Sequence, residues 1–413
     1  MERYAKYKDS GVEWVGSIPD DWKAVRVRFL CDITTGDKDT VNRDDEGAYP
    51  FYVRSPIVER IDTFTFDGEA VLTAGDGVGA GKVFHYVNGK FDYHQRVYNL
   101  HNFRRVTGRY LYYFMQENFY KEIERGNAKS TVDSIRLPML QDFVITFPPS
   151  AGEQNQVVKY LDRRTAEIDG LLADLHAQAE MLERYKRELI ANAVMHGLDK
   201  AAPRKDSGVD WIGDIPAHWT ITKTKWMFEI VKRIYGKEDR DVLSITQKGI
   251  KVKDIESNEG QLAESYASYQ VVNVNDFAMN SMDLLTGWVD CSPFEGVTSP
   301  DYRVFRFHPS KQQCHDYYKY LFQMCYKNRI FYRLGQGVSN LGRWRLQADQ
   351  FLNMKLPQPP IDEQEKIAAY LDSRTTKVEG LIADISEQIK KLKQYRQIVI
   401  HDAITGKIKV TEG

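Results

Sequence analysis

Residues 8–22 read Lys8-Asp-Ser-Gly-Val-Glu-Trp14-Val-Gly-Ser-Ile-Pro19-Asp-Asp-Trp22, and residues 205–219 repeat them as Lys205-Asp-Ser-Gly-Val-Asp-Trp211-Ile-Gly-Asp-Ile-Pro216-Ala-His-Trp219. A second repeat follows in the same order and spacing: Glu153-Gln154, Tyr160-Leu161-Asp162, Arg164-Thr165 and Gly170-Leu171 return as Glu363-Gln364, Tyr370-Leu371-Asp372, Arg374-Thr375 and Gly380-Leu381. Between these repeats the two halves diverge. A doubled chain with a shared frame and unshared inserts predicts two different recognition surfaces on a pseudo-twofold scaffold.

The repeat divides the 413 residues into four segments. We expect a first recognition domain at 1–149 and a first long helix at 150–198. A second recognition domain at 199–360 and a second long helix with a C-terminal tail at 361–413 complete the chain. Each half, at roughly two hundred residues, is long enough for a hydrophobic core of its own.

Composition indicates a soluble globular protein, because 42% of the residues are hydrophobic and 28% are charged. The apolar runs are shorter than the roughly 20 residues of a membrane span. The cysteines Cys31, Cys291, Cys314 and Cys325 have no CxxC spacing, so neither a zinc site nor a disulfide framework is indicated. We therefore expect a cytoplasmic protein that holds no metal or cofactor in this chain.

Charge is unevenly distributed along a chain whose net charge is only −1. Residues 302–355 contain ten Lys or Arg and two Asp, and residues 90–136 contain nine Lys or Arg and five Asp or Glu. Both stretches lie in the unshared inserts and are rich in aromatic residues. This favours a nucleic-acid partner over the alternative, an ordinary solvated face.

Two seams of apolar residues with a spacing of seven run through the expected long helices. They are Leu161, Ile168, Leu175, Leu182 and Leu189 in the first, and Leu371, Val378, Ile385, Leu392 and Val399 in the second. A heptad spacing predicts coiled-coil helices, each about 65 Å long at 1.5 Å per residue. We expect the two seams to pair antiparallel; the alternative is two independent helices, each packed on its own domain.

The ends of these helices carry sequence signals as well. Ser150 with Glu153 and Asp362 with Glu365 have the spacing of capping boxes, which predicts where the helices begin. Glycines at Gly197 and Gly406 are expected to follow the last helical residues.

Both inserts have the pattern of mixed α and β structure, so the fold class is α+β. In the first, short strands are predicted at 70–73, 83–87 and 97–100, before an aromatic-rich helix near 110–124. In the second, strands near 277–280, 289 and 304–307 precede a helix near 317–326. The four shared tryptophans of residues 8–22 and 205–219 are expected to pack each domain onto the helices.

A glycine-rich run at residues 75–82, Gly75-Asp-Gly77-Val-Gly79-Ala-Gly81-Lys82, invites comparison with a phosphate-binding loop. The spacing fails, because Asp76 stands where the first glycine is required and Val83 follows the lysine. A tight turn or bulge between two strands is the better interpretation. The sequence contains no arrangement of residues typical of a catalytic site, which argues against an enzyme.

Polar loops in the unshared inserts contain the residue types that read DNA. Arg bonds guanine bidentately, Gln and Asn do the same with adenine, and Ser or Thr reach phosphates. The candidate contacts are His94, Gln95, Arg96, Lys129, Ser130, Thr131, Tyr302, Arg303, Gln336, Ser339, Asn340, Arg343 and Arg345.

The chain resembles the specificity subunit of type I restriction-modification enzymes over nearly its whole length. The resemblance rests on the doubled Lys-Asp-Ser-Gly-Val-x-Trp-x-Gly-x-Ile-Pro-x-x-Trp segment, the Pro-Pro runs before Glu153-Gln154 and Glu363-Gln364, and the Tyr-Leu-Asp and Arg-Thr motifs that follow. The order variable region, helix, variable region, helix is also similar.

The resemblance implies a non-catalytic DNA-binding subunit. Each variable domain would read one half of a bipartite, asymmetric DNA site, and the helices would set the gap between the halves. Two copies of a modification methyltransferase subunit would dock on the chain and use S-adenosylmethionine to methylate adenine, and restriction subunits that use ATP and Mg would join them. The alternative from another class is a duplicated protein-binding scaffold without DNA specificity.

Overall fold

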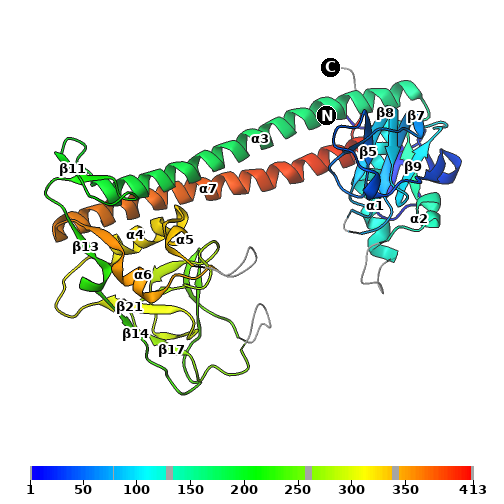
Figure 1. Cartoon of the computed structure of the whole chain (residues 1–413). Coiled ribbons are helices and arrows are strands. Elements are labelled where there is room, and N and C mark those ends of the chain that lie inside the picture. The colour runs from blue at the N-terminus through cyan, green and yellow to red at the C-terminus, as the bar shows by residue number, and fades with distance from the viewer. Residues whose placement is uncertain (1, 78, 127–133, 256–262, 337–343, 411–413) are drawn as a thin grey trace. The chain divides into compact units, whose positions relative to one another are not determined.

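The computed structural model describes residues 2–77, 79–126, 134–255, 263–336 and 344–410. It divides into two compact units (Figure 1). The first unit comprises Met1–His176 with Glu387–Gly413, and the second comprises Ala177–Ser386. Each unit therefore contains one recognition domain, one part of the first long helix and one part of the second.

The first domain is built on a six-stranded sheet with the strand order β4-β9-β7-β8-β5-β6. Neighbouring strands are antiparallel except for β5 and β8, which run parallel. The strands are β4 (Asp32–Thr35), β5 (Tyr49–Tyr52), β6 (Glu59–Ile61), β7 (Phe66–Ala74), β8 (Phe84–Tyr93) and β9 (Val97–His101).

Side chains on β7 alternate between two buried clusters, as the period of a strand requires. Val71 packs on the face that helix α1 (Gly108–Gly126) covers, in the cluster that contains Tyr110. Leu72 points to the other face and packs with Phe91. Burial on both faces makes this strand the centre of the domain.

The second domain contains a four-stranded antiparallel sheet with the order β14-β21-β18-β19. Its strands are β14 (Phe228–Val231), β18 (Phe277–Met279), β19 (Val289–Cys291) and β21 (Arg303–Phe307). Two further pairs, β15 (Leu243–Thr246) with β16 (Gly249–Val252) and β17 (Gln270–Val272) with β20 (Gly296–Thr298), stand beside it. The helices of this domain are α4 (His315–Lys327), α5 (Ile330–Leu334) and α6 (Ala348–Asn353).

The two sheets share the same plan. The order β4-β9-β7-β8 of the first domain corresponds to β14-β21-β18-β19 of the second, and a helix, α1 or α4, follows the last of these four strands along the chain in each. The α+β class and the predicted strands and helices of both inserts are thereby confirmed. The domains differ in what surrounds these four strands, since only the first adds β5 and β6 to the sheet.

The segments that frame each domain form short strand pairs of matching design. In the first half, β1 (Tyr7–Asp9) pairs with β2 (Ser17–Pro19), and β3 (Lys23–Arg26) pairs with β10 (Val144–Phe147). In the second, β11 (Arg204–Asp206) pairs with β12 (Asp214–Pro216), and β13 (Thr220–Lys223) pairs with β22 (Lys355–Gln358). The remaining short elements are α2 (Leu137–Asp142) and the 3-10 turns η1 (Val27–Phe29), η2 (Thr40–Asn42) and η3 (Thr224–Trp226).

The long helices are α3 (Ala151–His196) and α7 (Ile361–Ile404). Within the first unit, Arg396 of α7 contacts Asp169 of α3, with Nε 2.8 Å from Oδ1. Within the second unit, Lys186 of α3 forms an ion pair with Glu379 of α7. The N-terminal part of each helix thus lies beside the C-terminal part of the other, so the helices run antiparallel in each unit (Figure 1).

The seam residues are shielded from solvent along both helices. Six of them, Leu161, Ile168, Leu371, Val378, Ile385 and Val399, are buried. The other four, Leu175, Leu182, Leu189 and Leu392, are partly buried. Exposed positions between them carry charged side chains together with some apolar ones, such as Leu171 and Leu381.

The capping-box prediction is wrong at the start of α7, because the helix begins at Ile361 rather than after Asp362. The carbonyl of Pro360 accepts the main-chain N–H groups of Glu363 and Gln364 instead. Gly197 and Gly406 follow the last turns with φ of 73° and 68°, in the left-handed region that favours glycine. Those two predictions are confirmed.

Candidate nucleic-acid interface

The repeated tryptophans attach each domain to a helix. Trp22 and Trp219 are completely buried. The indole Nε1 of Trp219 donates to Glu363 Oε2 at 2.9 Å, and that of Trp22 lies 3.4 Å from Glu153 Oε1. Glu153 and Glu363 are therefore acceptors for tryptophan side chains, which explains why glutamate occurs at both positions of the repeat.

A buried tyrosine ties each domain to the end of the other long helix of its unit. Tyr110 of α1 donates its hydroxyl to the carbonyl of Ile404 in α7 at 2.9 Å. Tyr317 of α4 donates to the carbonyl of Val194 in α3 at 2.8 Å. The last carbonyls of a helix have no partner inside it, so these bonds satisfy the helix ends while fixing the domains.

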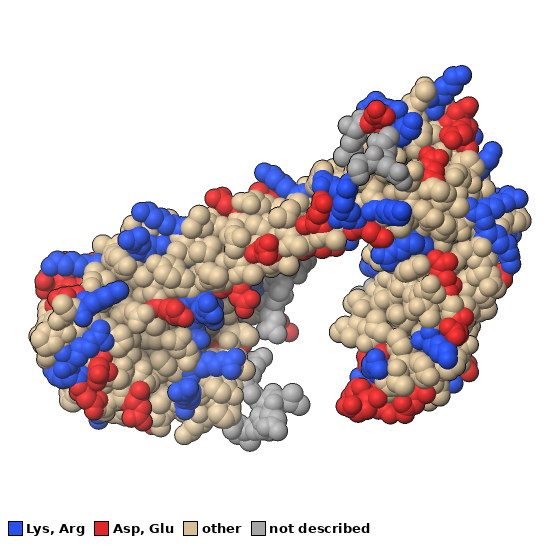
Figure 2. Space-filling model, turned by 90° about the horizontal axis from the view of Figure 1, so that it is seen from above, with Lys and Arg blue, Asp and Glu red and all other residues tan. Residues whose placement is uncertain are grey.

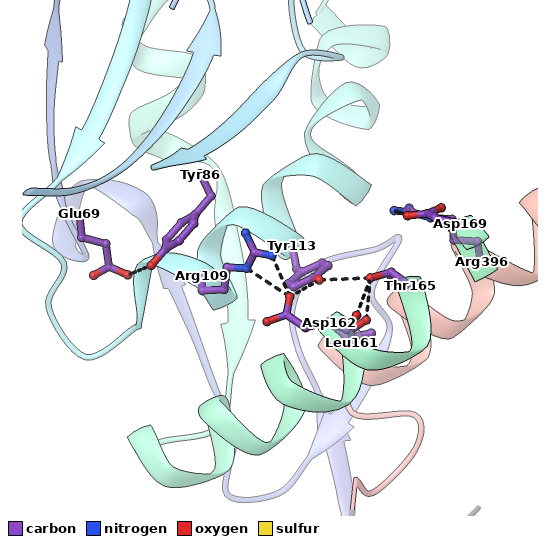
Figure 3. A network of polar contacts seen from close by, with 9 residues as sticks. All are labelled: Glu69, Tyr86, Arg109, Tyr113, Leu161, Asp162, Thr165, Asp169 and Arg396. Atoms are coloured by element: carbon purple, nitrogen blue, oxygen red, sulfur yellow. Dashed lines mark hydrogen bonds and ion pairs between the residues drawn. The ribbon is translucent and has the colours of Figure 1, made fainter. Parts of the chain in front are cut away.

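A second tyrosine and an aspartate form the same contact in each half, and Figure 3 shows that of the first half. Tyr113 Oη donates to Asp162 Oδ1 at 2.6 Å, and Tyr320 Oη donates to Asp372 Oδ1 at 2.6 Å. In the first half Arg109 joins this contact, with Nη2 2.8 Å from Asp162 Oδ1. The aspartate of the repeated Tyr-Leu-Asp motif thus accepts a hydrogen bond that links the long helix to the domain.

Glutamine completes the shared attachment. Gln154 is buried, and its Nε2 donates to the carbonyl of Pro148 at 2.9 Å, while Oε1 accepts the N–H of Thr107 at 2.8 Å. Gln364 makes the corresponding bonds to Pro359 at 2.9 Å and Cys314 at 3.0 Å. Both side chains of the repeated Glu-Gln pair therefore bond the domain to the start of its long helix.

Several predicted DNA contacts lie outside the residues that the structure describes: Lys129, Ser130, Thr131, Ser339, Asn340 and Arg343. The described residues that flank them are paired. Gln336 and Arg345 exchange two main-chain hydrogen bonds of 2.9 and 3.1 Å, and Asp76 forms a bridge with Ser134. Gln336 and Arg345 both have exposed side chains.

The predicted edge at residues 94–96 divides into a buried and an exposed part. His94 is only 3% exposed, and its Nδ1 accepts the N–H of Arg96 at 3.0 Å. Burial lowers the pKa of His94, which favours the neutral ring. Gln95 and Arg96 are exposed. His94 therefore cannot reach a base edge in this conformation, whereas its two neighbours can.

Tyr302 and Arg303 in the second domain are less accessible. Arg303 is 9% exposed, and its Nη2 donates to the carbonyl of Leu346 at 2.8 Å. Its guanidinium also lies over the ring of Phe351, 5.2 Å from the centroid, and burial lowers its pKa. Tyr302 is partly buried. The Arg303 side chain is thus directed into the domain, where it bonds a main-chain carbonyl.

Sequence reasoning missed a cluster on the first domain. Asp76 accepts a hydrogen bond from Arg54 Nη1 at 2.9 Å and another from Arg96 Nη1 at 2.6 Å. Arg54 was not predicted, because it follows β5 in a stretch without any motif. The glycine-rich run around Asp76 was the available signal, and it predicted a tight turn or bulge rather than a cluster of charged side chains.

The described residues of the molecular surface carry charges of both signs and form no metal site. On the face shown in Figure 2, the described Lys and Arg side chains are interspersed with Asp and Glu. Among the described residues, no group of three His, Cys, Asp or Glu side chains is arranged to hold a metal ion. In the same part of the chain, no helix combines the length and the apolar character needed to cross a membrane.

A family model for the type I restriction modification DNA specificity domain matches residues 19–181 and 232–391. The chain belongs to this family. Subunits of this family recognise DNA targets and are not themselves catalysts, and they assemble with other restriction-modification subunits. The alternative, a duplicated protein-binding scaffold without DNA specificity, finds no support among the relatives.

Relatives extend over almost the whole chain. The type I restriction enzyme EcoDI specificity subunit of Escherichia coli is 23% identical and covers 95% of this chain and 90% of its own length. The MjaVIII specificity subunit of Methanocaldococcus jannaschii is 22% identical over 95% and 94%. A chain solved in work on complex assembly and conformational transition of the type I R-M system has the same fold, with a TM-score of 0.68 at 12% identity over 95% of this chain and 99% of that one.

Proposed function

We propose that each recognition domain of this specificity subunit reads one half of a bipartite, asymmetric DNA site. The helix pair α3 and α7 sets the number of unread base pairs between the halves. Two copies of a modification methyltransferase subunit dock on the frame, one for each half. Each copy would bind S-adenosylmethionine and methylate an adenine, and restriction subunits that use ATP and Mg would join the complex.

The main support for this proposal is that two unlike domains are attached to the long helices by the same set of hydrogen bonds. Trp to Glu, Tyr to a helix-end carbonyl, Tyr to Asp and Gln to Pro recur in both halves. Equivalent frames present equivalent surfaces, and equivalent surfaces suit two copies of one partner. The domains held by those frames carry different edges, which suits two different half-sites.

The exposed candidates for DNA contact are Gln95 and Arg96 in the first domain and Gln336 and Arg345 in the second. Gln can bond adenine and Arg can bond guanine through two hydrogen bonds each in the major groove. Tyr302, which is partly buried, and the six candidates outside the described residues complete the proposed set. His94 and Arg303 support these edges and do not contact bases.

A domain replacement tests this proposal. Residues 220–358, from the start of β13 to the end of β22, are replaced by residues 23–147, which run from β3 to β10. The chain then holds two copies of the first domain on its own frame. Co-expressed with its methyltransferase subunit, it should methylate a symmetric site in which the first half-site occurs twice as an inverted repeat.

Methylome sequencing of the host cells gives the result directly, with the unaltered chain as the reference. A replaced chain that still directs methylation to the original asymmetric site would show that the domains do not carry half-site specificity. The reciprocal chain, with two copies of the second domain, should yield the other symmetric site and serves as the matched control.

A further inference from the structure

The glycine-rich run at residues 75–81 forms the loop between β7 and β8, where it brings two other segments of the first domain close to its own main chain. A Cβ on Gly75 would lie 2.9 Å from the carbonyl oxygen of Arg96, and a Cβ on Gly79 would lie 2.4 Å from that of Arg54. Gly75 N also donates to Arg96 O at 2.7 Å. The glycines are thus explained by the close approach of two arginine residues.

Asp76, between these glycines, holds both arginine side chains. Its Oδ1 accepts from Arg54 Nη1 and its Oδ2 from Arg96 Nη1, so each carboxylate oxygen binds one guanidinium. Burial raises the pKa of the Asp76 carboxyl, but the hydrogen bonds and charges of the two arginines outweigh this and lower it overall. The carboxylate therefore stays ionised and keeps both arginines in place.

The outer parts of both arginines face solvent. The Arg54 side chain is 45% exposed and that of Arg96 is 62% exposed, against 20% for Asp76. A guanidinium has five N–H donors, so each arginine retains donors beyond the one used by Asp76. The main-chain bridge between Asp76 and Ser134 places this cluster beside the segment that follows the predicted contacts at 129–131.

The corresponding residue types in the second domain are used differently. Arg303, which like Arg96 precedes a valine, donates its guanidinium to a main-chain carbonyl inside the domain. Asp283 accepts through Oδ1 the N–H groups of Leu285 and Thr286 in its own turn. The arrangement of Arg54, Asp76 and Arg96 thus belongs to the variable part of the first domain rather than to the repeated frame.

We propose that Arg54 and Arg96 read guanine in the half-site of the first domain and that Asp76 is their positioning residue. This rests on the proposed function, in which each domain reads one half-site. The guanidinium fork matches the O6 and N7 acceptors that guanine presents in the major groove. A side chain already held in place loses less conformational entropy on binding.

Phosphate is the other acceptor that an arginine fork fits. Phosphate contacts position a protein without carrying sequence information, and both domains need them. Two exposed guanidinium groups held in place by one carboxylate are better suited to the directed contacts of base reading. The two uses also respond differently to replacement of arginine by lysine, which keeps the charge and loses the fork.

The test uses the complete complex with its methyltransferase subunit and a duplex containing the site that the unaltered chain methylates. Each guanine of the first half-site is replaced in turn, and Kd is measured for the unaltered complex, Arg54→Lys and Arg96→Lys. Each variant should lose about tenfold or more of the discrimination at one guanine. Discrimination in the second half-site and the salt dependence of binding should stay unchanged, because the charge is retained.

Arg104→Lys is the matched control. Arg104 lies in the same domain, its side chain is 53% exposed, and it pairs with a single aspartate, Asp32, at 2.6 Å. It should leave discrimination in both half-sites unchanged. Asp76→Asn, compared with Asp32→Asn, should weaken discrimination in the first half-site alone, which a general loss of stability would not do.

The outcomes separate this inference from the function on which it rests. Sequence-independent binding by the unaltered complex would overturn the proposed function. Specific binding by the unaltered complex, together with a first half-site that lacks guanine or with unchanged discrimination in both lysine variants, would overturn only the guanine assignment. An equal loss of affinity for every sequence in the lysine variants would assign the arginines to phosphate.

Discussion

Arg109 of the first domain and Asp316 of the second occupy matching positions on α1 and α4, yet they complete the attachment to the helices in different ways. Arg109 donates to Asp162 on α3 and stacks over the ring of Tyr86, 4.8 Å from its centroid (Figure 3). Asp316 pairs with Lys319 on its own helix and lines a groove of about 950 Å³ within the second unit. At this position an arginine bonds the first domain to α3, whereas in the second domain an aspartate bonds only within its own helix and borders the groove.

The comparison shows which positions a doubled chain keeps and which it changes. Positions that bond the domain to the long helices, such as Tyr113 and Tyr320, are the same in both halves. Neighbouring positions on the same helices differ in charge and size. A recognition domain can therefore change its surface as long as its anchors to the helices remain.

The largest expected effect tests the anchors. Trp22→Ala and Trp219→Ala each remove a completely buried tryptophan, which typically costs about 3–5 kcal/mol. Trp22→Ala should lower the unfolding free energy of the first unit and Trp219→Ala that of the second. Hydrogen exchange measured by mass spectrometry, peptide by peptide, distinguishes the two units.

Trp226→Ala is the control, because that tryptophan is 63% exposed. It should change stability by less than about 0.5 kcal/mol. A Trp226→Ala loss as large as that of Trp219→Ala, or equal destabilisation of both units by either anchor variant, would contradict the assignment of one anchor to each unit.

An intermediate effect is expected at Glu117 of α1, which matches Met324 of α4. Burial raises the pKa of Glu117 to about 7 from its ordinary value of 4.5, although Lys121 and Arg396 oppose the shift. A folded-state pKa above the unfolded value means that the folded state binds the proton more tightly. The contribution of Glu117 to the stability of the fold is therefore fully present below pH 4.5 and is lost as the pH rises towards 7.

Glu117→Met should therefore stabilise the first unit at pH 8 by on the order of 1–2 kcal/mol more than at pH 4, allowing for partial exposure of the carboxyl. Unfolding free energies measured at the two pH values give this difference. Glu180→Met, at an exposed position of α3 in the second unit, is the control and should leave the unfolding free energy of the first unit unchanged. The same gain from Glu117→Met at both pH values would rule out this explanation.

The smallest effect concerns the paired helices. The ion pairs Asp169–Arg396 and Lys186–Glu379 occupy equivalent positions of the repeat, one in each unit. Asp169 and Glu379 are 52% and 59% exposed, so Asp169→Asn and Glu379→Gln should each cost about 0.2–1 kcal/mol, and less at high salt. Unfolding free energies at low and high salt measure this. A loss of several kcal/mol from one variant alone would mean that the two halves of the frame are not equivalent.

Much of the fold could be predicted because its signals are local. The seam from Leu161 to Leu189 has a heptad spacing that any long antiparallel pair would need, and the short apolar runs around Val71 and Val304 are separated by turn residues, as strands are. The capping box at Asp362 failed because the carbonyl of Pro360 accepts the first main-chain N–H groups, so the helix already begins at Ile361.

The candidate interface was less predictable, since exposure depends on neighbours from distant segments. Arg96 and Arg303 each precede a valine, in sequences of the same type. Arg96 faces solvent because Asp76 holds it from the β7–β8 loop, whereas Arg303 lies under Leu346 and against Phe351. Residue type could propose both as DNA contacts but could not separate them.

By itself, the amino-acid sequence determined that this protein is doubled, that two heptad seams pair, and that unlike domains occupy equivalent frames, because repeats and periodicities are properties of the chain order. Only the tertiary structure decided which polar side chains reach the surface. Burial arises when segments far apart in the sequence pack together, as residues 54, 76 and 96 do on the first domain. Their hydrogen bonds select one exposed conformation of each arginine, and no local pattern encodes that choice.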